Sequence, residues 1–437
     1  MTVPVIPSLP IIGHSLPFQR NALKFTSEMQ KKYGDVFQIS LLNEKFIALL
    51  TPEATKDIFL DKDDLFSSKE GWAVSLGPTF ENGLMLRDFD DHKYHRTLLQ
   101  DSFRHDAIHG YLEIIQPIIN QWVENLKKAG SFNLYQSVKQ LMFDISLSLF
   151  FLDVKPDESE KLNKLFMDSI ASATSAIRWP LPFTKMKKGL KAREFLLDYF
   201  ESKAGLINDD SKKTLFAELV NTNKGDAGLT NFEIAEHMIF LLLAAHDTTT
   251  ITLTNSIYSL SQNVDFRNDL IREANEVNHS DISSLKNGLV GESIFKEAMR
   301  YYPPVPFSIR HVVRDTEIQS YPLKAGTYLT ISPLLLHHDD RYWDNPDLFD
   351  PYRFIDPNYH NKAYFPFAGG AHTCLGKFFA SYIYKNVIYK FVQNIDNFEI
   401  DESLEIRPTP IPHPVKDVLV SASVSYTHLT LPTICSV

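Results

Sequence analysis

The residues best suited to chemistry lie in a glycine-rich stretch, residues 367–376, which reads Phe-Ala-Gly-Gly-Ala-His-Thr-Cys-Leu-Gly. It holds Cys374, and the only other cysteine, Cys435, lies almost at the C-terminus. A helical pattern without proline follows from Leu375 to Val392. A cysteine at the start of a helix gains from the helix dipole and from unpaired N–H groups, which lower the pKa of its thiol and favour a metal-binding thiolate. Glycines also let the backbone approach a large flat molecule, so the stretch suits a metal held in a planar macrocycle.

A lone cysteine has other interpretations. It is more often a buried, inert side chain, and a structural zinc site would need further cysteines at ligand spacing, which Cys374 lacks. His105 and His109 have the spacing of a helical metal site, but without the glutamate that a zinc protease needs. Residues 337–340, His-His-Asp-Asp, fit a polar turn. We therefore expect no metal ligand other than Cys374.

The spacing Phe-x-x-Gly-x-x-x-Cys-x-Gly, formed by Phe367, Gly370, Cys374 and Gly376, resembles the haem-binding loop of the cytochrome P450 family. The resemblance covers roughly residues 1 to 420. It implies a mainly α fold with a small β-rich part, the cytochrome P450 fold, in a single domain over residues 1–423. It also implies haem b (iron protoporphyrin IX), with Cys374 as the axial ligand. Residues 424–437 would then be a terminal extension, which need not be native.

Glu297 and Arg300 are three residues apart and therefore share one face of a helix. Alone, such a pair is common and usually lies at the surface. Its place upstream of Cys374 and before a Pro-Pro pair resembles the family's K helix, and Arg353 resembles the third member of the family's Glu-Arg-Arg triad. The resemblance implies that these three residues support the cysteine loop and are not catalytic.

His92 and Arg96 put two hydrogen-bond donors on one helix face, and His372 lies two residues before the cysteine. A haem has two propionates, and arginine forks suit carboxylates. His92, Arg96, Arg310 and His372 resemble the family's propionate ligands. For His92 alone a solvent-facing side chain is the ordinary interpretation, but the His-x-x-x-Arg spacing, seen in bacterial members, favours the functional one.

Residues 244–249, Ala-Ala-His-Asp-Thr-Thr, resemble the family's oxygen-activating motif in a long helix. Asp247 is costly on an apolar helix face unless it has a partner or a role. Splitting O2 consumes protons, so an acid beside a hydroxyl suits the chemistry: Thr248 would hold the reduced dioxygen and Asp247 would relay protons from solvent. The family usually has glycine where this chain has Ala245, whose methyl group would narrow the groove beside the haem. Alternatively, Asp247 is satisfied within its helix and the threonines only pack.

Residues 66–86 contain several glycines and a proline among aromatic residues, which predicts a long loop. Loops of this length are often functional. By resemblance this region lines the substrate pocket, and the candidate contacts are Trp72, Val74, Phe80 and Leu84, together with Ala244 on the long helix. A surface loop with a few anchoring apolar side chains is an equally valid interpretation.

The elements that must position these residues are predicted from proline, glycine and hydrophobic spacing. The prolines of residues 4–17 predict an extended strap without helix. A helix is predicted over 21–33, then a β-hairpin of 36–39 with 46–50, and then a short helix that begins at Pro52. Helices are predicted over 90–220, with breaks near 130 and at 179–183, and from a capping box at Thr230 and Glu233 to about 260. Helices continue to 301, and short strands follow at 311–313 and 327–331.

The break at residues 179–183 reads Trp-Pro-Leu-Pro-Phe and lies among basic residues: Arg178, Lys185, Lys187, Lys188, Lys191 and Arg193. Apolar tips beside a positive cluster are typical of a peripheral membrane contact or of an entrance for apolar substrates. A solvated loop between helices gives the same pattern.

The composition restricts the classes of molecule that the protein can bind and the compartment in which we expect it. The chain has 437 residues and a formal charge of −10, which argues against nucleic acid. Two cysteines cannot form a disulfide framework, so we expect a reducing, cytoplasmic location. The longest apolar run, 238–245, is far shorter than the roughly 20 residues that span a bilayer, and the N-terminus lacks the features of a signal peptide.

By resemblance, the function is haem-thiolate monooxygenation, in which one oxygen atom from O2 enters a small hydrophobic substrate such as a fatty acid, terpenoid or sterol. The sequence contains no dinucleotide glycine motif and no iron–sulfur cysteine set. We therefore expect a monomeric enzyme with a separate ferredoxin or flavodoxin-type electron donor, docked near Lys377 and Lys385. The alternatives are a haem-thiolate binding protein or sensor, and a peroxygenase or isomerase that needs no electron donor. The acid–alcohol pair favours the monooxygenase over a sensor or isomerase.

Overall fold

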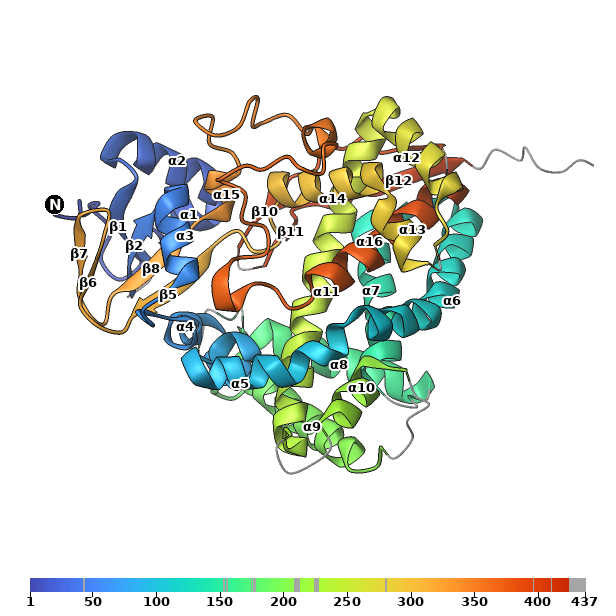
Figure 1. The fold of residues 1–437 in the computed structure, drawn as a ribbon, viewed down its shortest axis with the longest axis horizontal. Helices are drawn as coiled ribbons and strands as arrows, with labels where there is room; N and C mark the ends of the chain where they lie inside the picture. Colours follow the sequence, from blue (N-terminus) through green and yellow to red (C-terminus); the bar gives the residue numbers. More distant parts are fainter. Residues whose placement is uncertain are drawn as a thin grey trace, which may run out of the picture.

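The computed structural model describes residues 1–423 apart from 42–43, 152–153, 155, 174, 176–177, 208–212, 224–227, 280, 396 and 410. The predicted terminal extension, 424–437, lies outside the described residues. A β-rich part that includes the N-terminus lies beside a larger helical part, and helix α11 runs through the middle of the molecule (Figure 1). The predicted mainly α fold with a small β-rich part is confirmed.

The α-helices are α1 (Ser15–Arg20), α2 (Ala22–Tyr33), α3 (Pro52–Leu60), α4 (Ser68–Phe80), α5 (Phe89–Leu99), α6 (His105–Ala129), α7 (Leu134–Phe150), α8 (Pro156–Ala173), α9 (Lys185–Ala204), α10 (Leu215–Thr222), α11 (Asn231–Gln262), α12 (Val264–Glu276), α13 (Ile282–Asn287), α14 (Leu289–Tyr301), α15 (Pro333–Leu336) and α16 (Lys377–Asn394). Short 3-10 helices are η1 (Leu84–Leu86), η2 (Gln100–Phe103), η3 (Pro351–Phe354) and η4 (Gly370–His372). The strands are β1 (Val36–Leu41), β2 (Glu44–Leu49), β3 (Phe66–Ser67), β4 (Ser131–Asn133), β5 (Ser308–Val312), β6 (Thr316–Ile318), β7 (Tyr321–Leu323), β8 (Tyr328–Ile331), β9 (Asn397–Glu399), β10 (Ile406–Arg407), β11 (His413–Pro414) and β12 (Leu419–Ser423).

The largest sheet has the strand order β1-β2-β8-β5-β3, with β2 and β8 parallel and the other neighbours antiparallel. The predicted hairpin is confirmed, because β1 and β2 pair with Val36 opposite Leu49. The strands predicted near 311–313 and 327–331 are present as β5 and β8, which pair with each other. Since β5 carries Arg310, this sheet positions one of the predicted propionate ligands.

The N-terminal strap is extended where it pairs with the sheet. The backbone N–H of Ile6 donates to the carbonyl of Gln38 at 3.2 Å, and the N–H of Gln38 donates to Pro4 at 2.8 Å. The prediction that this segment contains no helix is wrong at its end, where α1 includes Pro17. Proline is tolerated there because N–H groups in a first turn have no partner within the helix.

The predicted loop over residues 66–86 is wrong, since most of it forms α4. The hydroxyl of Ser67 accepts a hydrogen bond from the N–H of Glu70 at 2.8 Å. The carboxylate of Asp88 accepts another from the N–H of Ser68 at 2.7 Å. These bonds satisfy N–H groups that the start of a helix leaves free, and one of the two acceptors is remote in the sequence.

The glycines that suggested a loop differ in their surroundings. A Cβ on Gly71 would lie 2.8 Å from the Cα of Arg310 and 2.8 Å from the carbonyl oxygen of Ile309. A Cβ on Gly77 would meet only the side chain of Ala73, at 3.6 Å, which is an ordinary contact. Gly71 therefore lets α4 pack directly on the strand that carries Arg310.

Helix α11 has the predicted start and remains helical through its threonines. The hydroxyl of Thr230 accepts from the N–H of Glu233 at 3.2 Å, and the Glu233 carboxylate accepts from the N–H of Thr230 at 2.9 Å, which confirms the capping box. Further along, the hydroxyl of Thr250 donates to the carbonyl of His246, one turn back, at 2.7 Å. Such bonds satisfy hydroxyl groups inside a helix.

The main hydrophobic core lies between α6, α7, α11, α14 and α16, and two smaller clusters lie against the largest sheet. Helix α16, which follows the cysteine loop, is buried along most of its length and packs against α11. The core therefore fixes the helix after Cys374 relative to the helix that carries Asp247. Within the described residues, no helix is both long and apolar enough to cross a membrane.

We predict that Gly71→Ala and Gly77→Ala change stability in opposite directions. Gly71→Ala would push α4 away from β5, and overpacking of this kind lowers the free energy of unfolding by about 1–3 kcal/mol. Gly77→Ala replaces a poor helix former without a clash and should raise the free energy of unfolding by up to about 1 kcal/mol. Urea unfolding followed by circular dichroism measures both, and equal effects would contradict the packing role of Gly71.

Candidate haem-thiolate site

The cysteine loop is held by its own backbone and by the start of α16. The N–H of Cys374 donates to the carbonyl of Phe367 at 3.0 Å, and the N–H of Gly376 donates to the Cys374 sulfur. Gly376 is the N-cap of α16. The loop thus aims a backbone donor at the sulfur, an arrangement that stabilises a thiolate.

The net pKa shift of Cys374 is opposite to the predicted one. Burial raises the pKa of the thiol, although the Gly376 N–H and the charges of Arg96 and Lys377 oppose the shift. The side chain is nevertheless accessible to solvent. Accessibility together with desolvation is expected of a thiol that faces the space of a cofactor inside the protein, and a bound metal ion would deprotonate it.

We predicted that the glycines of the cysteine loop allow the backbone to approach a flat molecule, and the structure corrects this for two of them. Gly370 has a φ of +60°, and a Cβ there would overlap the carbonyl oxygen of Phe59 in α3. A Cβ on Gly369 would lie 3.1 Å from the Cβ of Phe59. These two glycines therefore seat the loop on α3. Only Gly376 has room beside it, with the Phe103 ring 3.9 Å from a Cβ.

The predicted propionate ligands come together from α5, β5 and the cysteine loop. The rings of His92 and His372 lie with their centroids 3.9 Å apart. Burial, assisted by the charge of Arg96, lowers the pKa of His92 to about 4. Burial and repulsion by His92, Arg310 and Arg96 lower the pKa of His372 to about 2. Four groups that can carry positive charge therefore lie close to one another.

A haem fits this cluster of His92, Arg96, Arg310 and His372. Arg310 is buried, and it donates to two neutral acceptors, the hydroxyl of Ser308 at 3.2 Å and the carbonyl of Ile309 at 2.8 Å. Burial lowers its pKa to about 10, while Asp88 and Asp61 offset part of the effect. Two propionates would supply the negative charge that this cluster still lacks.

In the middle of α11, the accessible positions are mainly small residues, with the half-buried Leu243 beside them. Ala244 is exposed and Ala245 and Thr248 are half-buried, whereas His246 and Asp247 are buried. Ala244, Ala245 and Thr248 share one side of the helix. The hydroxyl of Thr248 donates to the carbonyl of Ala244 at 2.7 Å, so this side presents methyl groups and one hydroxyl oxygen.

Asp247 has a partner that the sequence interpretation missed. Nδ1 of His246 lies 3.0 Å from Oδ1 of Asp247. Burial alone would raise the pKa of Asp247, but the hydrogen bond to His246 and the charges of His246, Lys139 and His413 lower it below its ordinary value. The buried carboxylate is therefore ionised at neutral pH. Its adjacency to a histidine in the sequence was the only available signal for this pair.

The predicted triad is brought together at the end of α14. The guanidinium of Arg300 donates to both oxygens of Glu297 at 2.8 Å, and Nε of Arg353 lies 3.2 Å from Oε1 of the same carboxylate. Arg300 also donates to the carbonyls of residues 337, 346 and 348 at 2.7–2.9 Å. The triad thus holds the segment that leads to the cysteine loop.

The predicted substrate contacts separate into two groups. Ala244 is accessible, and Trp72 and Val74 are half-buried on α4. Phe80 and Leu84 instead lie within the main hydrophobic core. The region predicted to be a pocket-lining loop is therefore mostly a helix, in which half-buried and exposed positions lie between buried ones.

The prediction that Lys385 lies on a docking surface is wrong. It is buried in α16, donates to the carbonyl of Leu285 at 2.8 Å, and pairs with Glu292 at 2.9 Å. Lys377 remains partly accessible, with its ammonium 4.8 Å from the ring centroid of the exposed Phe378. The apolar residues two positions before and after Lys385, Ile383 and Val387, were the signal that it faces the core.

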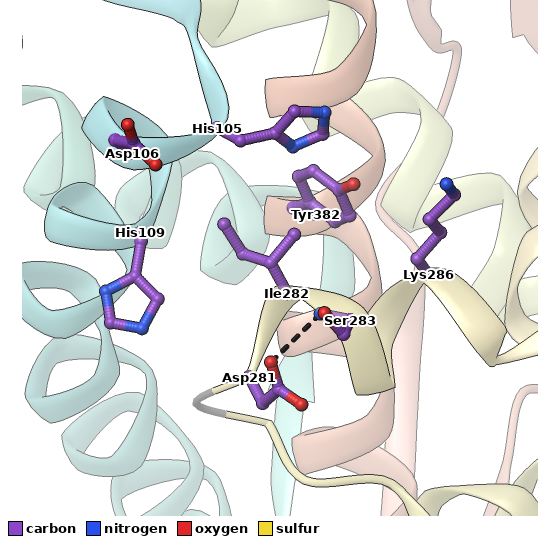
Figure 2. A pocket seen from close by; sticks show the side chains of 8 residues that line it. All are labelled: His105, Asp106, His109, Asp281, Ile282, Ser283, Lys286 and Tyr382. Atoms are coloured by element: carbon purple, nitrogen blue, oxygen red, sulfur yellow. Dashed lines mark hydrogen bonds between the residues drawn. The ribbon is translucent and has the colours of Figure 1, made fainter.

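His105 and His109 line a hollow of about 560 Å³ between α6, α13 and α16, together with Asp106, Asp281, Ile282, Ser283, Lys286 and Tyr382 (Figure 2). The two imidazoles point in different directions in this view. Among the described residues, no group of three or more His, Cys, Asp or Glu side chains is arranged to hold a metal ion. The hollow does not contain Cys374.

We predict that Glu297→Gln lowers the free energy of unfolding by about 3–5 kcal/mol, because it leaves the charge of Arg300 buried without its counter-charge. Haem content after purification should fall as well. Glu124→Gln is the matched control, since Glu124 forms a similar i, i+3 pair with Lys127 at the surface and should leave unfolding unchanged. Equal stability of the two variants would contradict the supporting role of Glu297.

The chain is similar to known proteins. A sequence model of the family described as Cytochrome P450 matches residues 3–427. Putative cytochrome P450 136 of Mycobacterium tuberculosis is 31% identical over 401 residues, which cover 88% of this chain and 80% of that protein. Taxane 10-beta-hydroxylase of Taxus cuspidata is 25% identical, over 92% of this chain and 86% of that protein.

A solved structure described as retinoic acid bound cyanobacterial CYP120A1 is 25% identical and superimposes with a TM-score of 0.86, covering 97% of this chain and 99% of that chain. The described fold agrees with these similarities. The chain therefore belongs to the cytochrome P450 family, whose members are haem-containing monooxygenases that use O2 and a redox partner.

Proposed function

We propose that this P450 inserts one oxygen atom from O2 into a small hydrophobic molecule, with haem b held by Cys374 and the cluster of His92, Arg96, Arg310 and His372. The observation that carries the proposal is the position of Asp247 and Thr248. An ionised, buried carboxylate directly precedes a hydroxyl on the accessible face of α11. A protein that only binds haem would have no use for this costly arrangement.

A haem with a thiolate ligand supplies the activation of O2. The residues of this chain orient the group and deliver protons. Oγ1 of Thr248, which donates to Ala244, keeps its lone pairs free to accept a hydrogen bond on the accessible side. Oδ1 of Asp247 is turned toward His246, so its carboxylate takes up a proton on the buried side and must rotate to pass it on.

The substrate is proposed to be apolar. Ala244, Trp72 and Val74 supply apolar surface at the accessible positions of α11 and α4. One similar protein is named a taxane hydroxylase, and the similar solved structure is described as retinoic acid bound. Both of those molecules are largely hydrocarbon, which supports a fatty acid, terpenoid or sterol as the substrate class.

The electron donor is proposed to be a separate ferredoxin or flavodoxin-type protein that docks beside the cysteine loop. Phe378 is 52% exposed at the start of α16, with Lys377 beside it. His105 lies 5.8 Å from Phe378 between ring centroids and also lines the hollow with Lys286. An apolar centre with basic neighbours suits an acidic partner, and Lys286 replaces Lys385 as a candidate contact.

The loop before α9 supports a peripheral membrane contact. Trp179 and Phe183 are 73% and 98% exposed, and Lys185, Lys187 and Lys188 are exposed next to them. Apolar tips with basic neighbours favour an anionic lipid surface. The enzyme is otherwise proposed to act as a cytoplasmic monomer with one P450 domain over residues 1–423.

We predict that Cys374→Ser abolishes the red-shifted Soret band of the reduced carbon monoxide complex, because a serine hydroxyl cannot act as a thiolate ligand. Haem content and absorbance spectra of the purified variant provide the measurement. A variant that keeps both normal haem content and the red-shifted band would show that Cys374 is not the axial ligand.

The proton-delivery roles predict two different defects. In a reconstituted system, Thr248→Ala should divert electrons to peroxide and lower the product formed per NAD(P)H by about tenfold, while haem binding stays normal. Asp247→Asn should slow turnover by about 10²-fold, since a positioned proton-transfer group typically contributes at least this much. Product and NAD(P)H are quantified together in each reaction.

Thr252→Ala is the matched control for Thr248→Ala. Its hydroxyl makes the same type of bond, to the carbonyl of Thr248 at 2.9 Å, but the residue is buried. This variant should retain wild-type coupling. If Thr248→Ala and Asp247→Asn both behaved like Thr252→Ala, the proposed relay would be wrong.

A further inference from the structure

An ion pair joins α9 to α11 far from the cysteine loop in sequence. Nη2 of Arg193 lies 2.5 Å from Oε1 of Glu236, and the two side chains are only 12% and 2% exposed. Nε of Arg193 also donates to the carbonyl of Thr79, in the last turn of α4, at 3.0 Å. Arg193 is therefore not part of the basic surface predicted around residues 179–183, because its charge is turned inward.

The same carboxylate holds the segment that follows α4. Nδ2 of Asn82 donates to Oε1 of Glu236 at 3.0 Å, and Nε of Arg87 donates to the carbonyl of Asn82 at 3.0 Å. Residues 79–87 are thus tied by side chains of α9 and α11 as well as by their own. A single carboxylate, Glu236, is the acceptor that these elements share.

Close packing around the ion pair leaves little freedom for small movements. A Cβ on Gly83 would overlap the ring of Phe240 in α11. The hydroxyls of Thr79 and Ser172, on α4 and α8, lie 2.8 Å apart. A Cβ on Gly189 in α9 would overlap the side chain of Ser172. Helices α4, α8, α9 and α11 therefore approach one another closely at these points, and closely packed elements separate by a discrete opening and not by gradual deformation.

These elements border the proposed substrate space. Glu236 lies eight residues before Ala244 on α11, about two helical turns, and α4 carries the half-buried Trp72 and Val74. Helices α4, α9 and α11 pack against one another. A bulky molecule that passes between α4 and α11 must move α9 or residues 79–87.

We propose that the Arg193–Glu236 pair is a clasp whose opening limits the rate at which bulky ligands reach the haem. The inference rests on the proposed function, since it takes the space beside Ala244 as the substrate site. In the closed state the two buried charges satisfy each other, and in the open state water solvates both. Removing Glu236 leaves Arg193 with only the more distant and exposed carboxylate of Glu81, at 3.7 Å. Removing Arg193 leaves the buried charge of Glu236 with only the neutral amide of Asn82. Either change destabilises the closed state most.

The test uses the haem-loaded protein and two azoles that differ in size, imidazole and clotrimazole, whose binding shifts the Soret band. Stopped-flow absorbance gives association and dissociation rates for wild type, Glu236→Gln and Arg193→Met. We expect both clotrimazole rates to rise about tenfold, which corresponds to about 1.4 kcal/mol in the barrier. The clotrimazole affinity should change little, and the imidazole rates should stay at wild-type values because a small ligand needs no opening.

Two further variants complete the test. Arg193→Met/Glu236→Met replaces both charges with apolar side chains of similar length, so it remains informative if a single variant folds poorly. This double variant should also raise the association and dissociation rates of clotrimazole, since no ion pair has to break. Lys324→Met, which removes a pair with Asp315 at the surface, should have no effect.

Wild-type clotrimazole rates in the folded double variant would overturn the clasp. Equal acceleration of imidazole and clotrimazole would also overturn it, because general loosening does not depend on ligand size. Hydrogen exchange in residues 79–87 should increase in both single variants. If the wild-type protein showed no azole-induced Soret shift, the proposed function and the clasp would both be wrong. If the shifts were normal but the clotrimazole rates of the variants equalled those of wild type, only the clasp would be wrong.

Discussion

The guanidinium of Arg300 makes five hydrogen bonds, and the rest of the site depends on them. Two go to Glu297 and three to backbone carbonyls at residues 337, 346 and 348, which uses every N–H that the group has. Because the pair is buried, each bond is made in a medium where an unmade bond would cost most. The segment before the cysteine loop has little regular structure of its own, and this buried charge supplies the order that a sheet or helix would otherwise give.

The cluster of cations near Cys374 differs from the Arg300 pair, because its charges have no full set of counter-charges within the protein. Burial lowers the pKa of all four groups, His92, Arg96, Arg310 and His372, and repulsion by neighbouring cations adds to the effect at the two histidines. The triad is complete within the protein, whereas this cluster is completed only by an anion. Binding of a dianionic cofactor would therefore stabilise the fold around it and restore the ordinary protonation of these side chains. The Glu297–Arg300 ion pair thus stabilises the segment before the cysteine loop. The cation cluster, in contrast, keeps positive charge without a full counter-charge at the place where the cofactor would bind.

The sequence predicted best those features that depend on local chemistry. The capping box of α11, the hairpin of β1 and β2, and the helix through Asp247 follow from nearby residues alone. Tertiary contacts explain the failures. Gly71 and Gly370 resemble turn glycines in the sequence, but their hydrogen atoms face the backbone of β5 and α3. Lys385 and Arg193 resemble surface cations, yet each has a buried acceptor contributed by a distant helix. Family motifs brought Glu297 and Arg353 together before the structure did, because they encode a contact across 56 residues, from position 297 to 353, which no local pattern contains.

Helix α11 connects the separate parts of this design. From its start to its middle it presents Glu236 to α4 and α9, then Ala244 and Thr248 at its accessible face, and then Asp247 to its buried side with His246. One continuous helix therefore carries Glu236 of the proposed clasp, the proposed oxygen-binding face and the proposed proton relay. Because the capped helix is continuous, movement of α9 and residues 79–87 need not displace Thr248. In the proposed arrangement, access for bulky substrates varies through side chains such as Arg193 without disturbing the proposed geometry of oxygen activation, so that an entrance that opens and a precise reaction site are compatible in one fold.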